Sequence, residues 1–531
     1  MAEEYDIVVG GGGSNGLVAA AYLAKAGLNV CVLECQNFLG SGLRCIKDVP
    51  SPGFIHDPYA TGHAAIQFNP LIVNDELKLQ AKYGLRYVAG KDPLSMIFPH
   101  KDMVLTIHKS IDDTCQEIAK ISEKDAVAYR EFSDFLKPMA GMLAQGMFST
   151  PAPFGSMMSM LESAGELGLE LMRMMLMSAW DIVAERFESD ELRILMTRFA
   201  SEMMISPFEA GTGASAILVF ELLHGVGIPF AEGGSEKLAL ALARCIEDHG
   251  GTIRTNVKVK SVKMENGRAA AFALEDGEEV VGKKGLLSTF HIKQLFGENG
   301  MVDQKLLPPG FAAKVKRIRP STFSAINQNF ALNDAPKFKA FGGKAQDAVI
   351  IWVSGDVTDY KKLFQDLANG LPGPVEPAAF VQTLVDPSRA PAGKHTLYLY
   401  AFAPYDIYGD AKKWSEVREK VADDILEKFR SVTTNMTDDN ILGRLIHTPL
   451  DIERVCPSFL KGDFCHMSQS LDQNLANRPI VGWGRYKTPI EGLYMGGAST
   501  SPGPTITGGG RAQCQVIFQD LGIDFDDVVR R

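Results

Sequence analysis

The chain has 531 residues, of which 46% are hydrophobic and 22% charged, so it is long enough for two or three domains and too apolar to be disordered. Its formal net charge of −10 argues against a nucleic-acid partner, which would call for a basic surface. The eight cysteines include no Cys-x-x-Cys pair, so neither a zinc site nor a thioredoxin-type centre is expected, and we predict no metal site.

The first residues are acidic and lead directly into a strand pattern, which is unlike a signal peptide or an Arg-rich transit peptide. No apolar run approaches the ~20 residues that cross a bilayer. These features predict a cytoplasmic protein with reduced thiols.

The first elements along the chain predict a βαβ unit. Residues 5–9 are an apolar run that ends in glycines, which is typical of a buried parallel strand. Residues 17–26 are rich in Ala and Leu and predict a helix that stops at Gly27, and residues 29–33 predict a second strand that ends at Glu34. Strand, glycine turn, helix and strand follow one another within about thirty residues, the length of such a unit.

The rest of the chain mixes helices and strands. Apolar periodicity and breakers predict helices at 111–220, 237–249, 414–431 and 510–521. The same reasoning predicts strands at 252–264, 269–281, 286–288, 348–353 and 396–400. The first two of these strands flank Asn266-Gly267, a hairpin signal, and the third is expected to return to the first sheet.

The strongest chemical signal is Gly11-x-Gly13-x-x-Gly16. Gly11 permits a tight turn after the strand, Gly13 lets the backbone approach a pyrophosphate, and Gly16 lets the helix pack closely on the sheet. Glu34, at the end of the second strand, is placed to bind the adenosine ribose hydroxyls. The motif follows a strand and opens a helix, so the pattern predicts a dinucleotide site.

Two later segments distinguish FAD from NAD. Residues 40–44 are a second small-residue stretch whose backbone amides would reach the diphosphate and the flavin. Residues 492–510 read as a strand, a glycine-rich turn and a helix start, a second place where amides and a helix dipole would meet an anionic group. A plain NAD dehydrogenase needs neither segment.

Several stretches together carry a family resemblance: 9–20, 52–57, 232–234, 466–479 and 486–500. Through them the sequence resembles the phytoene desaturase-like FAD oxidoreductases of the amine-oxidase-like flavoprotein group, most closely the branch of pyridine nucleotide-disulphide oxidoreductase domain-containing protein 2. The resemblance implies non-covalent FAD, because Ala498 and Ser499 follow Gly497 where some amine oxidases have a linking Cys. It also implies that the backbone of Val259 lies against the adenine.

The resemblance and the motifs predict a set of cofactor-binding residues: Gly11, Gly13, Ser14, Asn15, Gly16, Glu34, Cys35, Gly40, Ser41, Gly42, Leu43, Arg44, Val259, Gly497, Thr505, Ile506 and Thr507. Near the flavin we expect Tyr59, His63 and His466 as candidate catalytic residues. The pKa of His466 suits a base, although a structural histidine is an equally good interpretation.

The resemblance implies that hydride passes from a C–H or C–N bond to flavin N5. The leading hypothesis is an FAD-dependent desaturase or dehydrogenase acting on a small apolar or cyclic organic substrate, with oxygen or a quinone as electron acceptor. The alternatives are a flavin amine oxidase, a non-redox isomerase or saturase, and an FAD-binding scaffold. The Met-rich stretch 139–177 is interpreted as helical core, or else as an apolar entrance that takes substrate from a membrane surface, with the protein then peripheral to that membrane.

We therefore predict an α/β fold with a Rossmann-type doubly wound FAD domain made of discontinuous segments, 1–75, 230–300 and 478–531. The substrate domain would comprise 76–229, mainly helical, and 301–477, which contains a mixed sheet.

Overall fold

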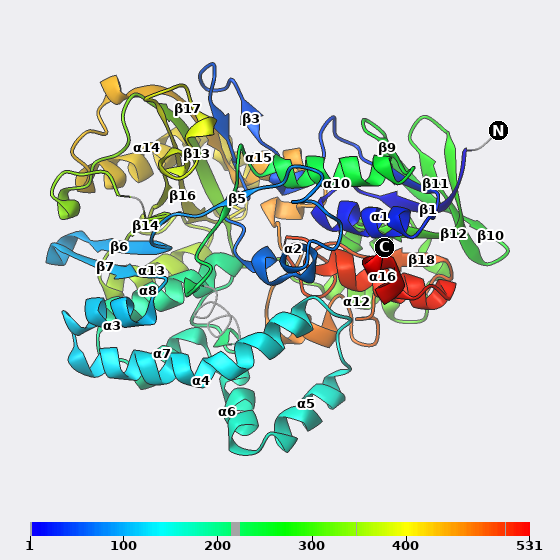
Figure 1. Cartoon of the computed structure of the whole chain (residues 1–531), viewed down its shortest axis with the longest axis horizontal. Coiled ribbons are helices and arrows are strands. Elements are labelled where there is room, and N and C mark those ends of the chain that lie inside the picture. The colour runs from blue at the N-terminus through cyan, green and yellow to red at the C-terminus, as the bar shows by residue number, and fades with distance from the viewer. Residues whose placement is uncertain (1–2, 214–222, 347, 505) are drawn as a thin grey trace.

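The computed structural model describes residues 3–213, 223–346, 348–504 and 506–531 and shows two halves, each built around a seven-stranded sheet (Figure 1). The first sheet lies on the right of Figure 1 and the second on the left. Segments from both ends of the chain meet in the first half, where α1 (Ser14–Lys25) packs against α16 (Gly508–Leu521).

The first sheet has the strand order β10-β11-β12-β1-β2-β9, with β18 also paired to β12. Its strands are β1 (Glu3–Gly10), β2 (Val30–Leu33), β9 (Thr252–Arg254), β10 (Val259–Glu265), β11 (Arg268–Leu274), β12 (Glu279–Ser288) and β18 (Leu493–Met495). The pairs of β1 with β2 and β12, β2 with β9, and β12 with β18 are all parallel. The helix α1 (Ser14–Lys25) packs between α10 (Glu236–Asp248) and α16 (Gly508–Leu521). This is the expected βαβ unit within a doubly wound fold.

The hairpin region is more divided than the sequence suggests. The turn at Asn266-Gly267 is confirmed, with both residues at positive φ between β10 and β11. The expected strand 252–264 is wrong as one element, because β9 pairs in parallel with β2 whereas β10 belongs to the antiparallel hairpin. The expected strand 269–281 is also broken, at a turn containing Gly277 (φ +93). Residues 286–288 are then the end of the long strand β12, beside β1 as expected.

The second sheet has the order β17-β13-β16-β15-β14-β6-β7. Its strands are β6 (Leu94–Phe98), β7 (Met103–Ile107), β13 (Ser324–Leu332), β14 (Ile350–Val353), β15 (Ala378–Phe380), β16 (His395–Ala403) and β17 (Ile441–His447). All pairs are antiparallel except β14 with β6. On one face, α14 (Trp414–Val432) completes an apolar core with β13 and β16. The other face packs against helical residues of the 111–213 region.

The helical region begins at residue 111, as the sequence predicts, and its described part ends at residue 213. Its helices are α3 (Ile111–Ala119), α4 (Glu123–Met147), α5 (Phe154–Ser163), α6 (Gly165–Leu176), α7 (Ala179–Arg186) and α8 (Asp190–Ala200). Figure 1 shows α5 and α6 projecting away from both sheets, with exposed Met160, Leu169 and Leu176. Among the described residues, no helix combines the length and the apolar character needed to cross a membrane.

Short elements connect these layers. The further strands are β3 (Ile46–Lys47) paired with β4 (Ile55–His56), and β5 (Tyr87–Val88) paired with β8 (Phe230–Ala231). The further helices are α2 (Pro70–Val73), α11 (Ile292–Phe296), α12 (Phe311–Arg317), α13 (Val357–Ala368), α15 (Pro449–Val455) and α17 (Phe525–Arg530). The residues on either side of the β3–β4 hairpin, and those of α15 and the loop after it, line the candidate site between the two halves.

Candidate active site

A cavity of about 500 Å³ lies between the two sheets, within the range of ~300–1,000 Å³ that is usual for small-molecule and cofactor pockets. It brings together most of the residues that the sequence singles out. These are Gly11, Gly13, Ser14, Asn15, Gly16, Glu34, Cys35, Gly40, Ser41, Gly42, Leu43, Tyr59, His63, Val259, His466, Gly497 and Ile506.

Two of the expected cofactor residues, Arg44 and Thr507, do not line this cavity. The guanidinium of Arg44 lies over the ring of Phe38, 4.5 Å from its centroid, and does not line the cavity. Thr507 is fully buried behind the cavity wall, where its hydroxyl accepts a hydrogen bond from Asn69 Nδ2 at 3.2 Å. Thr505 lies outside the described residues.

The first turn of α1 forms one wall of the cavity. Its N-cap is Gly13, and no side chain caps this helix end, so its amides and the positive end of the helix dipole are available to an anion. A Cβ added at Gly13 would meet Ser41 Cβ at 3.5 Å and no other heavy atom within 4 Å among the described residues. The space beside Gly13 is therefore open, as the approach of a diphosphate requires.

Glu34 lies at the end of β2, where its carboxylate is held by two backbone amides. Oε2 accepts a hydrogen bond from Gly12 N and Oε1 accepts one from Gln36 N, both at 2.8 Å. The side chain lines the cavity together with Val259 of β10. A carboxylate in this position can accept hydrogen bonds from the hydroxyls of a ribose, and Val259 provides an apolar wall for the attached base.

Two backbone amides at the N-terminus of α16 are hydrogen-bonded within the protein. Asn15 Oδ1, from α1, accepts hydrogen bonds from the amides of Gly509 at 3.0 Å and Gly510 at 3.1 Å. These two amides are therefore engaged by the protein, contrary to the expectation that they face an anionic group. The contact instead ties the two helices together.

His466 reaches the cavity from a loop in which it adopts a positive φ of 63°. Its Nδ1 lies 2.9 Å from Ser499 Oγ, which accepts the N–H of Ile292 at 3.1 Å. When the serine donates its proton to Nδ1, the ring proton of a neutral imidazole lies on Nε2. Burial, followed by the neighbouring His291 and Arg478, holds the pKa of His466 well below its usual value, so the ring is neutral at physiological pH.

His63 and Tyr59 differ in their hydrogen bonding. Both ring nitrogens of His63 have protein partners at 3.1 Å, Tyr87 Oη and Ser235 Oγ, and burial lowers its pKa to about 4. The hydroxyl of Tyr59 is buried without a hydrogen-bond partner among the described residues, while its ring stacks on His447 with centroids 5.5 Å apart. Of these two lining residues, Tyr59 is the one whose polar side-chain atom has no partner among the described residues.

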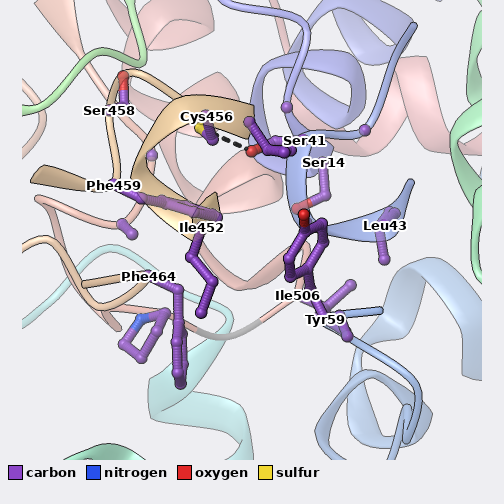
Figure 2. Close-up of a pocket in the computed structure, with 18 of the residues that line it drawn as sticks. Ser14, Ser41, Leu43, Tyr59, Ile452, Cys456, Ser458, Phe459, Phe464 and Ile506 are labelled. Carbon is purple, nitrogen blue, oxygen red and sulfur yellow. Dashed lines mark hydrogen bonds between the residues drawn. The ribbon is translucent and has the colours of Figure 1, made fainter. Parts of the chain in front are cut away.

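The middle of the cavity has apolar walls that face one another. Figure 2 shows Tyr59 and Ile506 on one side and Ile452 and Phe464 on the other. Ile452 belongs to α15, and the residues that follow this helix also line the cavity. The sequence interpretation missed this wall, because α15 is a short helix of seven residues without a chemical motif.

A second group that the sequence interpretation missed lies where the second half of the molecule closes the cavity. Glu202, Tyr398 and Tyr400 line it, and the fully buried Arg198 binds Glu202 four residues away. An arginine among apolar residues of α8, with a glutamate at i+4, is a signal that could have been noticed. Across the part of the chain that the structure describes, no group of three or more His, Cys, Asp or Glu side chains could hold a metal ion.

Comparisons with known proteins agree with this geometry. Residues 129–508 match the family model described as flavin containing amine oxidoreductase, and residues 8–72 match an NAD(P)-binding Rossmann-like domain. The chain is 28% identical to mouse pyridine nucleotide-disulfide oxidoreductase domain-containing protein 2, over 98% of this chain and 94% of that protein. It is also 28% identical to a limonene dehydrogenase component of Castellaniella defragrans, over 98% and 96% of the two chains.

Solved structures share the fold. An oxidoreductase from Methanosarcina mazei superposes with a TM-score of 0.60 at 16% identity, covering 97% of this chain and 99% of that one. Cyclohexylamine oxidase from Brevibacterium oxydans gives a TM-score of 0.58 at 15% identity, covering 98% and 99%. The matching flavin containing amine oxidoreductase model covers more than half of the chain and includes Glu202, Ile452 and His466 of the cavity lining, whereas the lining residues from Gly11 to Ile66 fall within the Rossmann-like match.

Proposed function

The chain belongs to the flavin containing amine oxidoreductases and is a flavin-dependent oxidoreductase, and we propose that its flavin is FAD, bound without a covalent link along the cavity. The observation that carries the proposal is the uncapped N-terminus of α1 beside the open space at Gly13. Glu34 lies at one end of the same cavity, in a position suited to a ribose. Residue 498, after Gly497, is alanine and offers no sulfur for a covalent bond.

We further propose that the substrate is a small apolar or cyclic organic molecule, and that oxygen or a quinone accepts the electrons. A bound FAD supplies the hydride acceptor. The substrate part of the cavity is walled by apolar side chains, namely Phe199, Ile228, Ile350, Phe380, Ile452 and Phe464. Such walls bind hydrocarbon groups and exclude water. Two relatives are named as a component of limonene dehydrogenase and a phytoene desaturase, which supports a substrate of this class.

The proposal assigns separate roles to the polar residues near the cavity. His466, whose neutral ring donates from Nε2 when Ser499 donates to Nδ1, would orient a polar group of the substrate or the flavin rather than carry a charge. Tyr59 has an unpaired hydroxyl that can form a similar bond. Both ring nitrogens of His63 are hydrogen-bonded to other protein side chains. Its role would therefore be to hold its own segment of the cavity wall in place.

A glycine substitution tests the cofactor assignment. Gly13 has φ −69° and ψ 170°, which alanine adopts readily, and its added methyl group would make an ordinary contact with Ser41. G13A should therefore fold but lose flavin, with its dissociation constant for FAD raised at least about 10-fold. The measurement is the visible flavin spectrum of the purified protein, followed by titration of the apoprotein with FAD.

Two further variants control this experiment. Gly155, in α5, has open space around its Cβ position, so G155A should keep wild-type flavin content. Gly16 has no such space, because a Cβ there would overlap the carbonyl oxygen of Gly11, and G16A should lower stability itself. A G13A protein that binds FAD as tightly as wild type would contradict the proposal.

The substrate class is tested by anaerobic bleaching. Wild-type protein with FAD bound would be mixed with terpenoids, cyclic ketones, amines and fatty acyl compounds, and the flavin absorbance followed. Bleaching by a terpenoid or another cyclic substrate is the expected result. Bleaching by amines alone would replace this proposal with an amine oxidase, and no bleaching would favour an isomerase, a saturase or an FAD-binding scaffold.

A further inference from the structure

Glu202 is the charged residue at the apolar end of the cavity. Three charged residues occur among the described lining residues, and two of them, Glu34 and Lys258, lie near β2 and β10 at the other end. Glu202 follows α8 and is surrounded at the cavity by Phe199, Met203 and aromatic residues of β16. A lone carboxylate among such groups is costly unless it has partners.

Two donors hold one oxygen of this carboxylate. Glu202 Oε1 accepts a hydrogen bond from Tyr400 Oη at 2.6 Å and another from Arg198 Nη1 at 2.5 Å. Oε2 has no hydrogen-bond partner among the described residues. The Glu202 side chain is 25% exposed, whereas that of Arg198 is 1% exposed. The carboxylate is thus anchored by one oxygen, and the other remains able to accept a bond from a ligand.

The charge around Glu202 distinguishes between possible ligands. Arg198 lies behind it, with the guanidinium 3.8 Å from the centroid of the Phe402 ring, and it neutralises the carboxylate. A second carboxyl near Arg198, that of Glu376, is buried and has its pKa raised to about 7 by that burial, so below pH 7 it is mainly protonated. An ammonium group would gain little from a neutral pair and would be repelled by Arg198, whereas a hydroxyl needs only an acceptor.

A hydrocarbon would leave the free oxygen of Glu202 without a partner after displacing water. Sites that hold an unpaired polar atom discriminate strongly against ligands that cannot bond to it. We propose that Glu202 is a specificity-determining residue that receives the hydroxyl of the substrate, and that the substrate is an apolar molecule carrying one hydroxyl group. This inference rests on the proposed function, because it places the substrate hydroxyl at one end of the same cavity that would hold FAD.

Three probes that share one carbon skeleton test the proposal: limonene, perillyl alcohol and perillylamine. Their dissociation constants would be measured at pH 6 from the perturbation of the flavin absorbance of the FAD-loaded protein. Wild-type protein should bind the alcohol at least about 10-fold more tightly than the hydrocarbon or the amine. E202L should lose this preference, with weaker binding of the alcohol and binding of limonene within about threefold of wild type.

A double variant keeps the proposal testable if E202L folds poorly. Removing Glu202 alone leaves Arg198 buried without its main partner, so the double variant R198M/E202L replaces the pair with apolar side chains. E209Q is the matched control, because Glu209 does not line the cavity but bonds Thr322 from outside it. E209Q should keep the wild-type order of the three probes.

The outcomes separate this inference from the proposed function. The hydroxyl assignment is overturned if the double variant keeps the preference for the alcohol, if the amine binds most tightly to wild-type protein, or if wild-type protein binds none of the probes. Failure of the proposed function has a different readout, which is the absence of bound FAD or of flavin reduction by any compound. Glu202-dependent binding, together with no flavin reduction by any compound, would support the hydroxyl site and reject the proposed dehydrogenation.

Discussion

Arg389 and Asp57 form a fully buried ion pair, with Arg389 Nη1 donating to Asp57 Oδ2 and both side chains 0% exposed. The two residues lie 332 positions apart, Asp57 just after β4 and Arg389 before β16. Arg389 also binds Asp386 and the carbonyl oxygen of Ala231. Burial alone would raise the pKa of Asp57, but the charge and hydrogen bond of Arg389 hold it below the usual value. The pair thus joins the two halves beside the cavity.

Removing one partner of this pair should be strongly destabilising. R389M would leave Asp57 as an uncompensated buried charge, and we expect the free energy of unfolding to fall by about 3–5 kcal/mol. The measurement is denaturant unfolding of the FAD-loaded protein, followed by flavin fluorescence. R319M is the control, because Arg319 and Asp472 are 58% and 60% exposed and an exposed pair contributes less than about 1 kcal/mol. Equal losses in the free energy of unfolding for R389M and R319M would show that burial does not determine how much an ion pair of this protein contributes to stability.

His56 predicts an unusual response to acid. It is 1% exposed, and neither of its ring nitrogens has a hydrogen-bond partner among the described residues. Its ring stacks on Phe54, with centroids 6.2 Å apart, so phenylalanine, which is planar and aromatic but somewhat larger, is a suitable replacement. H56F should raise the free energy of unfolding at pH 7 by about 1–3 kcal/mol, since it removes buried polar atoms that are unpaired.

The pH dependence of this effect follows from the pKa of His56, which burial lowers to about 4 from 6.5. The unfolded chain binds the proton more tightly than the folded one, so wild-type stability is complete above pH 6.5 and falls as the pH decreases toward 4. At pH 5 this one group accounts for about 2 kcal/mol. The melting temperature of H56F should therefore fall less between pH 7 and pH 5, whereas H100F, at an exposed histidine, should follow wild type. Parallel curves for H56F and wild type would refute the assignment.

Local spacing was sufficient to predict part of this site. Gly11, Gly13 and Gly16 lie on one turn, and Glu34 follows the next strand, so their proximity depends on about thirty residues of chain. The hairpin turn at Asn266-Gly267 is equally local, because both residues favour positive φ. The sequence therefore indicated the cofactor end of the cavity well.

Other features depend on partners that are distant in the sequence. The break between β9 and β10 arises because one strand pairs with β2 and the other with β11, and apolar periodicity does not identify pairing partners. Glu202 acquires its setting from Tyr400, 198 positions away. Periodicity places both residues in apolar segments but cannot show that their side chains meet at a cavity.

Glu376 should make the protein less stable as the pH rises from about 4.5 to 7. Its Oε1 accepts a hydrogen bond from Ser354 at 2.7 Å, while Oε2 is buried without a partner in the described part of the chain. Burial raises its pKa from 4.5 to about 7, so the folded protein binds this proton more tightly than the unfolded chain. Stability contributed by this group is then complete below pH 4.5 and falls as the pH rises toward 7, by about 3 kcal/mol at pH 7, and changes little above that.

A neutral replacement of Glu376 tests the direction in which stability changes with pH. E376Q keeps the size and an acceptor for Ser354 but cannot ionise, so its melting temperature should exceed that of wild type by a margin that grows from pH 5 to pH 8. E416Q, at an exposed position in the first turn of α14, should show no such growing margin. A margin that shrinks with rising pH would mean that the Glu376 carboxylate is stabilised, not destabilised, by its surroundings.

His466 should influence the rate of flavin reduction without titrating in the working pH range. Its pKa is held well below 6.5 by burial and by the neighbouring His291 and Arg478, and Nδ1 is engaged by Ser499. A neutral imidazole that donates from Nε2 orients a group instead of exchanging a proton with solvent.

We expect H466N to slow anaerobic flavin reduction by about 10-fold or more, because the loss of one hydrogen bond in the transition state is of this size. The rate for H466N should depend on pH between 6 and 9 in the same way as the rate for wild-type protein. Stopped-flow absorbance with a reducing substrate gives both rates. If wild-type protein shows a titration step in this range that H466N lacks, His466 is a base with a pKa near neutrality, and the role assigned to its buried, neutral ring is wrong.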